Sequence, residues 1–172
     1  VDRVACIFPF EYDVYKEAGA KVEFVGHPLV DIVKPSMTIN EANAFAGKKE
    51  GRKLILLMPG SRLMEIKKML PTLLEAAKII QKQLPEVDFV MPRAGTIPLN
   101  LLEEKIQASG LDVSITEGHN YDLFSVADLA LATSGTVTLE AALCGLGSVI
   151  VYRTNPLTYM IAKLVVNIPH IG

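Results

Sequence analysis

Seven short apolar runs, most of them separated by helical patterns, limit the folds open to this chain more than any other feature of its sequence. Continuous apolar runs are typical of strands buried on both faces of a parallel sheet, and the helices between them provide the crossover connections. The pattern therefore predicts an α/β fold with a doubly wound, mostly parallel, Rossmann-like sheet, whose ligands bind at the carboxyl ends of the strands. The predicted strands span residues 4–8, 22–25, 54–58, 87–91, 113–116, 129–132 and 148–152.

Residues 26–52 differ in texture from the rest of the chain, because a proline-containing stretch and the charged run GKKEGR flank only a short helical pattern. We therefore expect an interdomain linker at 26–52. Residues 1–25 then form the tail of a truncated N-terminal domain, and residues 53–172 form most of a C-terminal domain. The chain starts without Met and stops directly after an apolar segment, so we expect a piece of a longer protein.

The composition favours a globular protein and argues against several partners. Half of the 172 residues are hydrophobic, and the formal net charge is −2 without a basic cluster, so a nucleic-acid partner is not expected. Cys6 and Cys144 lie far apart among apolar neighbours, which is typical of free thiols in a reducing compartment. The sequence shows neither a signal peptide nor an apolar run of roughly 20 residues, so we expect a cytoplasmic protein.

The stretch 129–150 combines a buried strand, a turn of small residues and a helix. The turn is Ser134-Gly135-Thr136, and a helix that starts there leaves backbone N–H groups that favour an anion such as phosphate. Glu140 follows Thr136 by about one helical turn, so its carboxylate can accept hydrogen bonds from the vicinal hydroxyls of a ribose. The alternative is structural: Ser134 and Thr136 cap the helix, and Glu140 is a solvated helix residue.

A second combination of strand, turn and helix contains the sequence PGSR at 59–62. Gly60 allows close approach of the backbone, Ser61 can cap the helix or donate to a ligand oxygen, and Arg62 adds a permanent cation. The two turns together predict a phosphate site at the carboxyl edge of the sheet. Both the P-loop pattern and the G-x-G-x-x-G dinucleotide pattern are missing from the sequence, which excludes those functions. Taken alone, PGSR is weak evidence, because an arginine at a helix start is usually a surface residue; its pairing with the S-G-T-x-x-x-E pattern at 134–140 is stronger.

Two further loops at the same edge carry polar residues. Arg93 follows one predicted strand and brings another cation toward the site. After the next strand, Gly118 gives a base room against bare backbone, and His119 fits an exposed histidine better than a catalytic one. His27 either orients its own turn or reaches the ligand. The sequence has no Asp-x-Asp pair and no Cys and His spacing typical of a metal site, so we expect neither a metal nor a cofactor.

Five segments together resemble the lipid-A-disaccharide synthase family, in order and over nearly the whole chain. They are IFPFE at 7–11, VGHPLVD at 25–31, LLMPGSR at 56–62, SVADLALATSGTVTLEAAL at 125–143 and VYRTNPLTYMIAKLV at 151–165. The family is an inverting glycosyltransferase of the two-domain GT-B architecture. The resemblance implies transfer of a diacylglucosamine unit from UDP-2,3-diacylglucosamine to a monosaccharide lipid acceptor. This step of lipopolysaccharide synthesis would take place at the cytoplasmic face of the inner membrane of a Gram-negative bacterium, without a metal.

The resemblance also implies roles for the two turns. Ser61 and Arg62 would contact the pyrophosphate of the donor, and Arg62 would act catalytically by stabilising the leaving group. Ser134, Gly135 and Thr136 would form the backbone cradle of the same pyrophosphate. These roles agree with those that strand, turn and helix chemistry suggests for the same residues.

Three other substrate contacts are carried over from the family. Glu140 would hold the ribose, the loop at Gly118 would lie near the uracil, and Arg153 would make a ligand or interdomain contact. The acceptor site and the general base would belong to the N-terminal domain of the full enzyme, which would also meet the membrane surface. We therefore expect the isolated 172 residues to bind UDP and to be inactive in sugar transfer.

Two alternative functions remain open at this point, and we also expect the chain to self-associate. Another GT-B enzyme acting on a UDP-sugar is the runner-up, either a peptidoglycan N-acetylglucosaminyltransferase or a UDP-N-acetylglucosamine 2-epimerase, although the expected G-G-rich turns are missing from the sequence. A non-catalytic nucleotide-binding module is the other. The segment 156–166 is apolar on more than one face and too short to span a bilayer, so we expect it to promote self-association.

Overall fold

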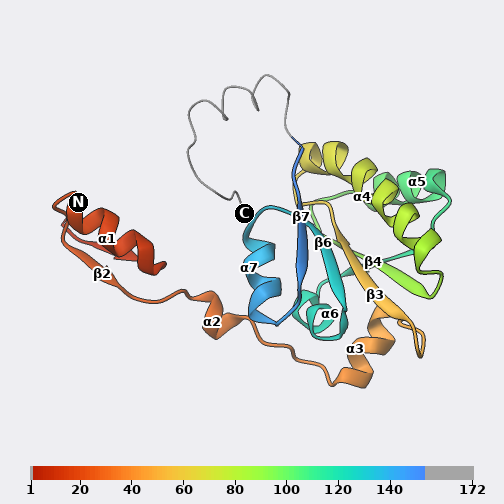
Figure 1. Ribbon diagram of the computed structural model, residues 1–172, viewed down its shortest axis with the longest axis horizontal. Coiled ribbons are helices and arrows are strands. Elements are labelled where there is room, and N and C mark those ends of the chain that lie inside the picture. The colour runs from red at the N-terminus through yellow and green to blue at the C-terminus, as the bar shows by residue number, and fades with distance from the viewer. Residues whose placement is uncertain (1, 154–172) are drawn as a thin grey trace. The chain divides into compact units, whose positions relative to one another are not determined.

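The computed structural model describes residues 2–153, and the chain divides into two compact units, one up to Lys34 and one from Pro35 onward (Figure 1). The segment 156–166, for which we expect self-association, lies outside the described residues. The small first unit is a β-α-β element. It consists of β1 (Val4–Cys6), α1 (Pro9–Glu17) and β2 (Val22–Phe24), followed by α2 (Leu29–Ile32). β1 and β2 are parallel. β1 ends before residue 8 because Phe8 is already the N-cap of α1, which starts at a proline.

The second unit contains a five-stranded sheet with all neighbouring strands parallel, in the order β5-β4-β3-β6-β7. The strands are β3 (Lys53–Met58), β4 (Val87–Arg93), β5 (Val113–Glu117), β6 (Leu129–Thr133) and β7 (Ser148–Val151). The helices are α3 (Ile39–Ala46), α4 (Leu63–Gln83), α5 (Leu99–Ser109), α6 (Asn120–Val126) and α7 (Thr136–Leu143). The predicted α/β class with a doubly wound parallel sheet is confirmed.

One group of helices covers each face of the sheet (Figure 1). The side chains of β3 point alternately to the two faces and show which helices cover each. Ile55 and Leu57 point into a core that they share with α4 and α5. Leu54, Leu56 and Met58 point to the opposite face and share a core with α3, α6 and α7. Since successive strand residues face opposite sides, a continuous apolar strand is the expected sequence of a strand covered on both faces.

α3 lies within the stretch 26–52, where we expect a linker, and it belongs to the second unit. The sequence signals of this helix are local. Thr38 and Glu41 form a capping box at its start, and Gly47 ends it with a left-handed backbone of φ 65°. Ala42 and Ala46 are buried in the core that α3 shares with α6. The interdomain role of residues 26–38 and 47–52 stays a prediction.

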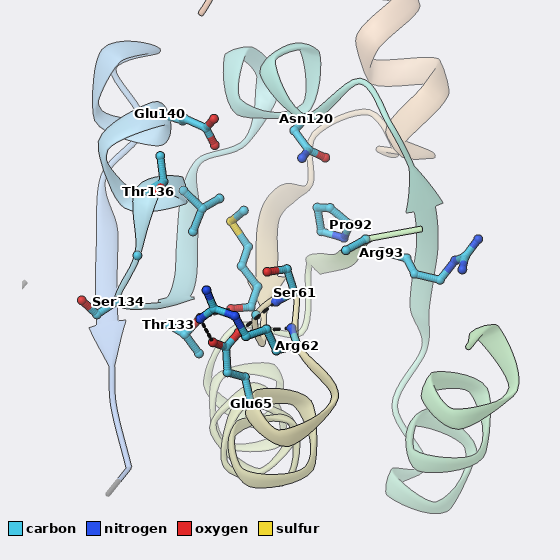
Figure 2. A pocket seen from close by; sticks show the side chains of 15 residues that line it. Ser61, Arg62, Glu65, Pro92, Arg93, Asn120, Thr133, Ser134, Thr136 and Glu140 are labelled. Atoms are coloured by element: carbon cyan, nitrogen blue, oxygen red, sulfur yellow. Dashed lines mark hydrogen bonds and ion pairs between the residues drawn. The ribbon is translucent and has the colours of Figure 1, made fainter. Parts of the chain in front are cut away.

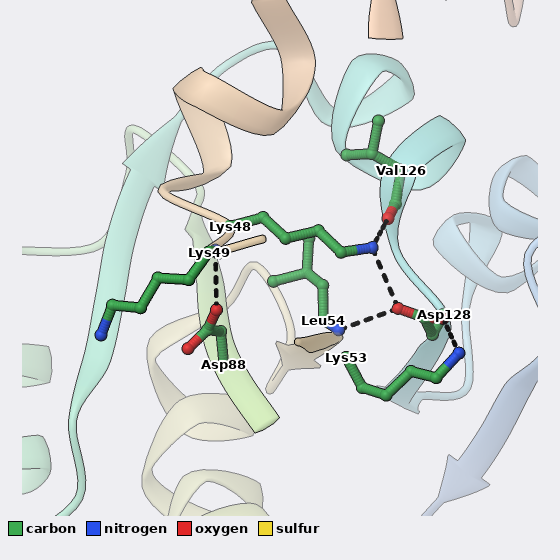
Figure 3. Close-up of polar contacts among 7 residues, drawn as sticks. All are labelled: Lys48, Lys49, Lys53, Leu54, Asp88, Val126 and Asp128. Atoms are coloured by element: carbon green, nitrogen blue, oxygen red, sulfur yellow. Dashed lines mark hydrogen bonds and ion pairs between the residues drawn. The ribbon is translucent and has the colours of Figure 1, made fainter. Parts of the chain in front are cut away.

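Asp128, which immediately precedes β6, ties together the amino-terminal edge of the sheet (Figure 3). Its carboxylate accepts hydrogen bonds from the Leu54 N–H at 2.9 Å and from the ammonium groups of Lys48 at 3.1 Å and Lys53 at 2.8 Å. Lys48 also donates to the carbonyl of Val126 at 2.9 Å. Burial alone raises the pKa of Asp128, but Lys53, the Leu54 N–H and Lys48 outweigh it and lower the pKa to about 2.

Replacing Asp128 with asparagine should lower the free energy of unfolding by about 1 kcal/mol at pH 7, because water screens part of these partly exposed pairs. The folded-state pKa of about 2 lies below the ordinary 3.8, so the carboxylate contributes fully above pH 4. Its contribution is lost as the pH falls toward 2. Denaturant unfolding at pH 7, 5 and 3 should show the difference between the two proteins shrinking at pH 3, and a constant difference would contradict this account.

Candidate nucleotide site

A pocket of about 340 Å³ lies at the carboxyl ends of β3, β4 and β6 (Figure 2). β3 is the central strand; β4, the next strand in the chain, lies on one side of it, and β6 lies on the other. The order of the sheet therefore reverses between β3 and β6, which is where doubly wound sheets bind their ligands. The pocket is lined by Met58, Gly60, Ser61, Arg62, Glu65, Pro92, Arg93, Ala94, Asn120, Thr133, Ser134, Gly135, Thr136, Val137 and Glu140.

The start of α7 forms one wall of this pocket. Gly135 is the N-cap and has no side chain to offer, and no side-chain cap is formed among the described residues. The Thr138 N–H donates to the Gly135 carbonyl at 3.1 Å, whereas the N–H groups of Thr136 and Val137 have no partner among the described residues and can bind an anion. The alternative in which Ser134 and Thr136 cap the helix is therefore not what the structure shows. Both residues line the pocket together with Gly135, as we expect for a phosphate cradle.

Glu140 lies one turn further along α7 and also lines the pocket. The residue is half-buried, and its Oε1 accepts a hydrogen bond from the hydroxyl of Tyr121 at 3.2 Å. The pKa of Tyr121 is raised by burial and by the negative charge of Glu140. The carboxylate of Glu140 is thus oriented by Tyr121 and faces the pocket, so Glu140 is not simply a solvated helix residue. Tyr121 comes from α6, and no sequence pattern connects it with a glutamate 19 positions later.

The start of α4 forms the opposite wall, and Glu65 caps it. Glu65 Oε2 accepts from the backbone N–H of Ser61 at 3.1 Å and of Arg62 at 3.2 Å. Its Oε1 accepts from the guanidinium of Arg62 at 2.8 Å (Figure 2). Burial alone raises the pKa of Glu65, but Arg62 and the two N–H donors lower it overall. The sequence carries a signal for this contact, because Glu65 stands at the third helical position, as in a capping box.

Arg93 lines the pocket, but its charge is used elsewhere. Its guanidinium donates to the carbonyl of Ile97 at 2.6 Å and pairs with Glu117. Figure 2 shows it extending away from Arg62 and Glu140. Arg93 therefore braces its own loop, although the sequence suggests a cation directed at the site.

The loops after β3 and β4 are joined by Thr96, whose hydroxyl donates to the carbonyl of Ser61 at 3.1 Å. Thr96 is exposed, and it was not among the residues expected from the sequence to form the site. This hydrogen bond fixes the turn that carries Ser61 against the neighbouring loop.

Gly118 and Arg153 are not among the residues that line the pocket. Gly118 has a left-handed backbone of φ 71° and leads into Asn120, which does line it. Arg153 is exposed and lies two residues beyond β7. The expected contacts of Gly118 with a base and of Arg153 with a ligand or another domain remain proposals.

The two histidines of interest make structural contacts. His27 belongs to the first unit, and its Nδ1 accepts from the backbone N–H of Leu29 at 3.1 Å, so it orients its own turn. His119 is the N-cap of α6, with φ 52°, and its Nδ1 lies 3.2 Å from Asp122 Oδ2. Its ring meets Phe45 edge-on at 5.3 Å between centroids. Neither histidine lines the pocket.

Asp122 fixes α6, and with it the position of Asn120 and Tyr121. The residue is only 2% exposed. Its Oδ1 accepts from the backbone N–H groups of Ser36 at 2.5 Å and Met37 at 2.7 Å, and its Oδ2 accepts from the Ser36 hydroxyl at 3.1 Å. Burial raises the pKa of Asp122, but these donors and His119 outweigh it, so the pKa lies below its ordinary value. The residue was not apparent from the sequence as a site-forming group.

Residues 2–153 hold no cluster of three or more His, Cys, Asp or Glu side chains arranged for a metal ion. Within that same range, every helix is too short or too polar to cross a membrane.

Comparison of the sequence with known proteins identifies its family. The sequence profile described as lipid-A-disaccharide synthetase matches residues 1–172. A lipid-A-disaccharide synthase of Geobacter sulfurreducens is 44% identical over 172 residues, which cover 100% of this chain and 45% of that protein. One of Neisseria meningitidis serogroup A is 37% identical over 175 residues, which cover 100% of this chain and 46% of that protein. The chain thus spans less than half the length of these curated relatives.

Solved structures share the fold at lower identity. The UDP-GlcNAc 2-epimerase of Neisseria meningitidis, bound to UDP-GlcNAc, has a TM-score of 0.59 and 20% identity, and the match covers 83% of this chain and 41% of that one. HepE of Anabaena, in complex with UDP-glucose, has a TM-score of 0.56 and 20% identity, covering 87% and 44%. These similarities agree with the Rossmann-like architecture of the second unit.

Proposed function

The chain belongs to the lipid-A-disaccharide synthetase family, and from that premise we propose that its second unit binds the nucleotide of UDP-2,3-diacylglucosamine. The observation that carries the proposal is the convergence of Glu140 and the starts of α4 and α7 on one pocket. Its volume of about 340 Å³ lies within the range of small-molecule sites. The UDP-sugars bound by the two solved proteins of similar fold support a uridine nucleotide as the guest.

Each group in the pocket has a distinct task in this proposal. The uncapped N–H groups of α7 bind one phosphate, and Arg62 together with the start of α4 serves the other. Glu140 accepts hydrogen bonds from the ribose hydroxyls, and the loop 118–120 meets the uracil. As the bond to the sugar breaks, negative charge builds up on the diphosphate, and Arg62 with the two helix starts stabilises the departing UDP.

The remaining parts of the reaction are assigned through the family. The acceptor is a lipid monosaccharide, and the general base and the acceptor pocket belong to the N-terminal domain of the complete enzyme. Transfer then gives the lipid A disaccharide at the cytoplasmic face of the inner membrane. Proximity of two substrates held by two domains would supply a large part of the rate.

Calorimetric titration of the 172-residue chain with UDP, UMP, uridine and ADP tests the proposal. UDP should bind, and ADP should bind more weakly, because in this proposal the loop 118–120 contacts uracil. Equal affinity for ADP would refute uridine specificity. Absence of binding for all four nucleosides and nucleotides would refute the assignment of the pocket and favour a scaffolding role.

Arg62→Ala should weaken UDP binding by about tenfold and leave uridine binding unchanged, because only UDP carries the charge that Arg62 neutralises. Titration of both ligands measures the two losses separately. Lys68→Ala removes an exposed cation from the same helix and serves as the control. Equal losses for UDP and uridine would place Arg62 outside the diphosphate site.

A further inference from the structure

The charges that line the pocket cancel, which is unexpected for a site that binds a diphosphate. Two arginines and two glutamates are the ionisable residues of the described lining. Arg62 is paired with Glu65, and Arg93 is paired with Glu117. A ligand with two or three negative charges therefore meets guanidinium groups that already have carboxylate partners, which offset part of their charge.

The two helix starts that face the pocket are in different states. The start of α7 has no side-chain cap, whereas the start of α4 is capped by the carboxylate of Glu65. The N–H groups of Ser61 and Arg62 are the donors that a phosphate would use at α4, and Glu65 Oε2 already accepts from both. Glu65 thus takes the place of an anion at one of two otherwise similar sites.

Gly60 shows that this placement of Glu65 is built into the turn. A Cβ atom on Gly60 would lie 2.6 Å from Glu65 Oε2 and 2.9 Å from Glu65 Cβ. The backbone of Gly60 also has φ 112°, a conformation that other residues rarely adopt. The turn therefore requires glycine, and the bare Cα of Gly60 leaves room for the Glu65 carboxylate in this position.

We propose that Glu65 determines phosphate specificity by acting as an internal anion that a second phosphate must displace. A monophosphate can bind at α7 while Glu65 keeps its cap. A diphosphate must move Glu65 from the Ser61 and Arg62 N–H groups, and the same movement frees the Arg62 guanidinium for the ligand. This inference rests on the proposed nucleotide function, and its test includes a ligand that has no nucleoside.

Glu65→Gln separates charge from shape, because glutamine keeps the size of the side chain and can still accept at a helix start. UDP and inorganic pyrophosphate should each bind about three- to tenfold more tightly to this variant, which no longer holds a competing charge. UMP and uridine should bind with unchanged affinity. Glu75→Gln is the matched control, since it removes the same charge from an exposed, Lys78-paired position on α4.

Calorimetry with UDP, UMP, uridine and pyrophosphate on the three proteins decides the matter. Tighter binding of UDP and pyrophosphate to Glu65→Gln alone supports the inference. If wild type binds UDP but Glu65→Gln binds UDP and pyrophosphate equally well or less well, Glu65 only caps the helix or holds Arg62, and the inference is wrong while the nucleotide function stands.

The remaining outcomes separate the inference from the nucleotide function. If UDP does not bind but Glu65→Gln strengthens pyrophosphate binding, the inference stands and the nucleotide function falls. If no ligand binds to any variant, both are wrong. Should Glu65→Gln fail to fold, as thermal unfolding would reveal, Glu65→Asp provides the second variant. Its carboxylate is one methylene shorter and should lose at least one of the two N–H contacts, so the same ligands should bind more tightly, and unchanged affinities would overturn the inference.

Discussion

Glu140→Ala should weaken UDP binding by about tenfold or more while leaving the thermal stability nearly unchanged. The carboxylate would lose charged hydrogen bonds to the ribose worth about 1.5 to 3 kcal/mol. Among residues 2–153, the substitution breaks a single side-chain hydrogen bond, the one at 3.2 Å from Tyr121. Titration calorimetry measures the first effect and a thermal melt measures the second.

A deoxynucleotide makes the test of Glu140 specific to the ribose. Wild type should prefer UDP to 2′-deoxy-UDP, because the deoxy compound lacks one of the two hydroxyls. Glu140→Ala should bind both compounds with nearly the same affinity. Tyr121→Phe removes only the group that orients Glu140 and should give a smaller loss, and Glu104→Ala, on the exposed side of α5, is the control. A variant that keeps the preference for UDP would show that another residue binds the diol.

Asp122→Ala should lower the free energy of unfolding by about 3 to 5 kcal/mol, the usual range for removing one partner of a buried charged network. The variant leaves the N–H groups of Ser36 and Met37 without their acceptor, and these donors hold the segment before α3 against α6. For a chain of this size the melting temperature should fall by about 10 °C. UDP binding should also weaken, because Asn120 and Tyr121 lie on the helix that Asp122 anchors.

Differential scanning calorimetry of wild type, Asp122→Ala and Asp112→Ala tests this prediction. Asp112 is an exposed carboxylate, so its removal should change stability by less than about 0.5 kcal/mol. Similar melting temperatures for the three proteins would mean that Asp122 contributes little, and that the segment before α3 is held by its apolar contacts instead.

The strands and the two site turns could be predicted from the sequence because their signals are local. The apolar runs set β3 to β7 to within two residues at each end, and small residues after β3 and β6 mark both turns. The turn residues Ser61, Arg62, Ser134, Gly135 and Thr136 were expected at one edge of the sheet, and all line the pocket together with Glu140.

The side chains that complete the site depend on tertiary contacts that no local pattern reveals. Tyr121 on α6 donates to Glu140 on the next helix, α7. Asp122 is buried against the segment that contains Met37, 85 positions earlier in the chain. Arg93 also follows a strand at the carboxyl edge, like Arg62, yet it turns to Glu117 because an acidic partner lies on the adjacent strand. Glu65 is different, because its place at the third position of α4 is a capping signal that the sequence contains. Only the structure shows that its carboxylate occupies the N–H groups that a phosphate would use.

β3 and β6 are hydrogen-bonded neighbours, with Met58, the last residue of β3, opposite Ala132, one residue before the end of β6. α4 leaves β3 toward one face of the sheet, and α7 leaves β6 toward the other, so each helix is anchored in its own core. The two helix starts consequently follow the ends of adjacent strands, so the backbone ladder between β3 and β6 keeps both at the same edge of the sheet. Because this placement depends on main-chain hydrogen bonds, a substitution within either core that leaves the β3–β6 ladder intact should leave both helix starts at the pocket.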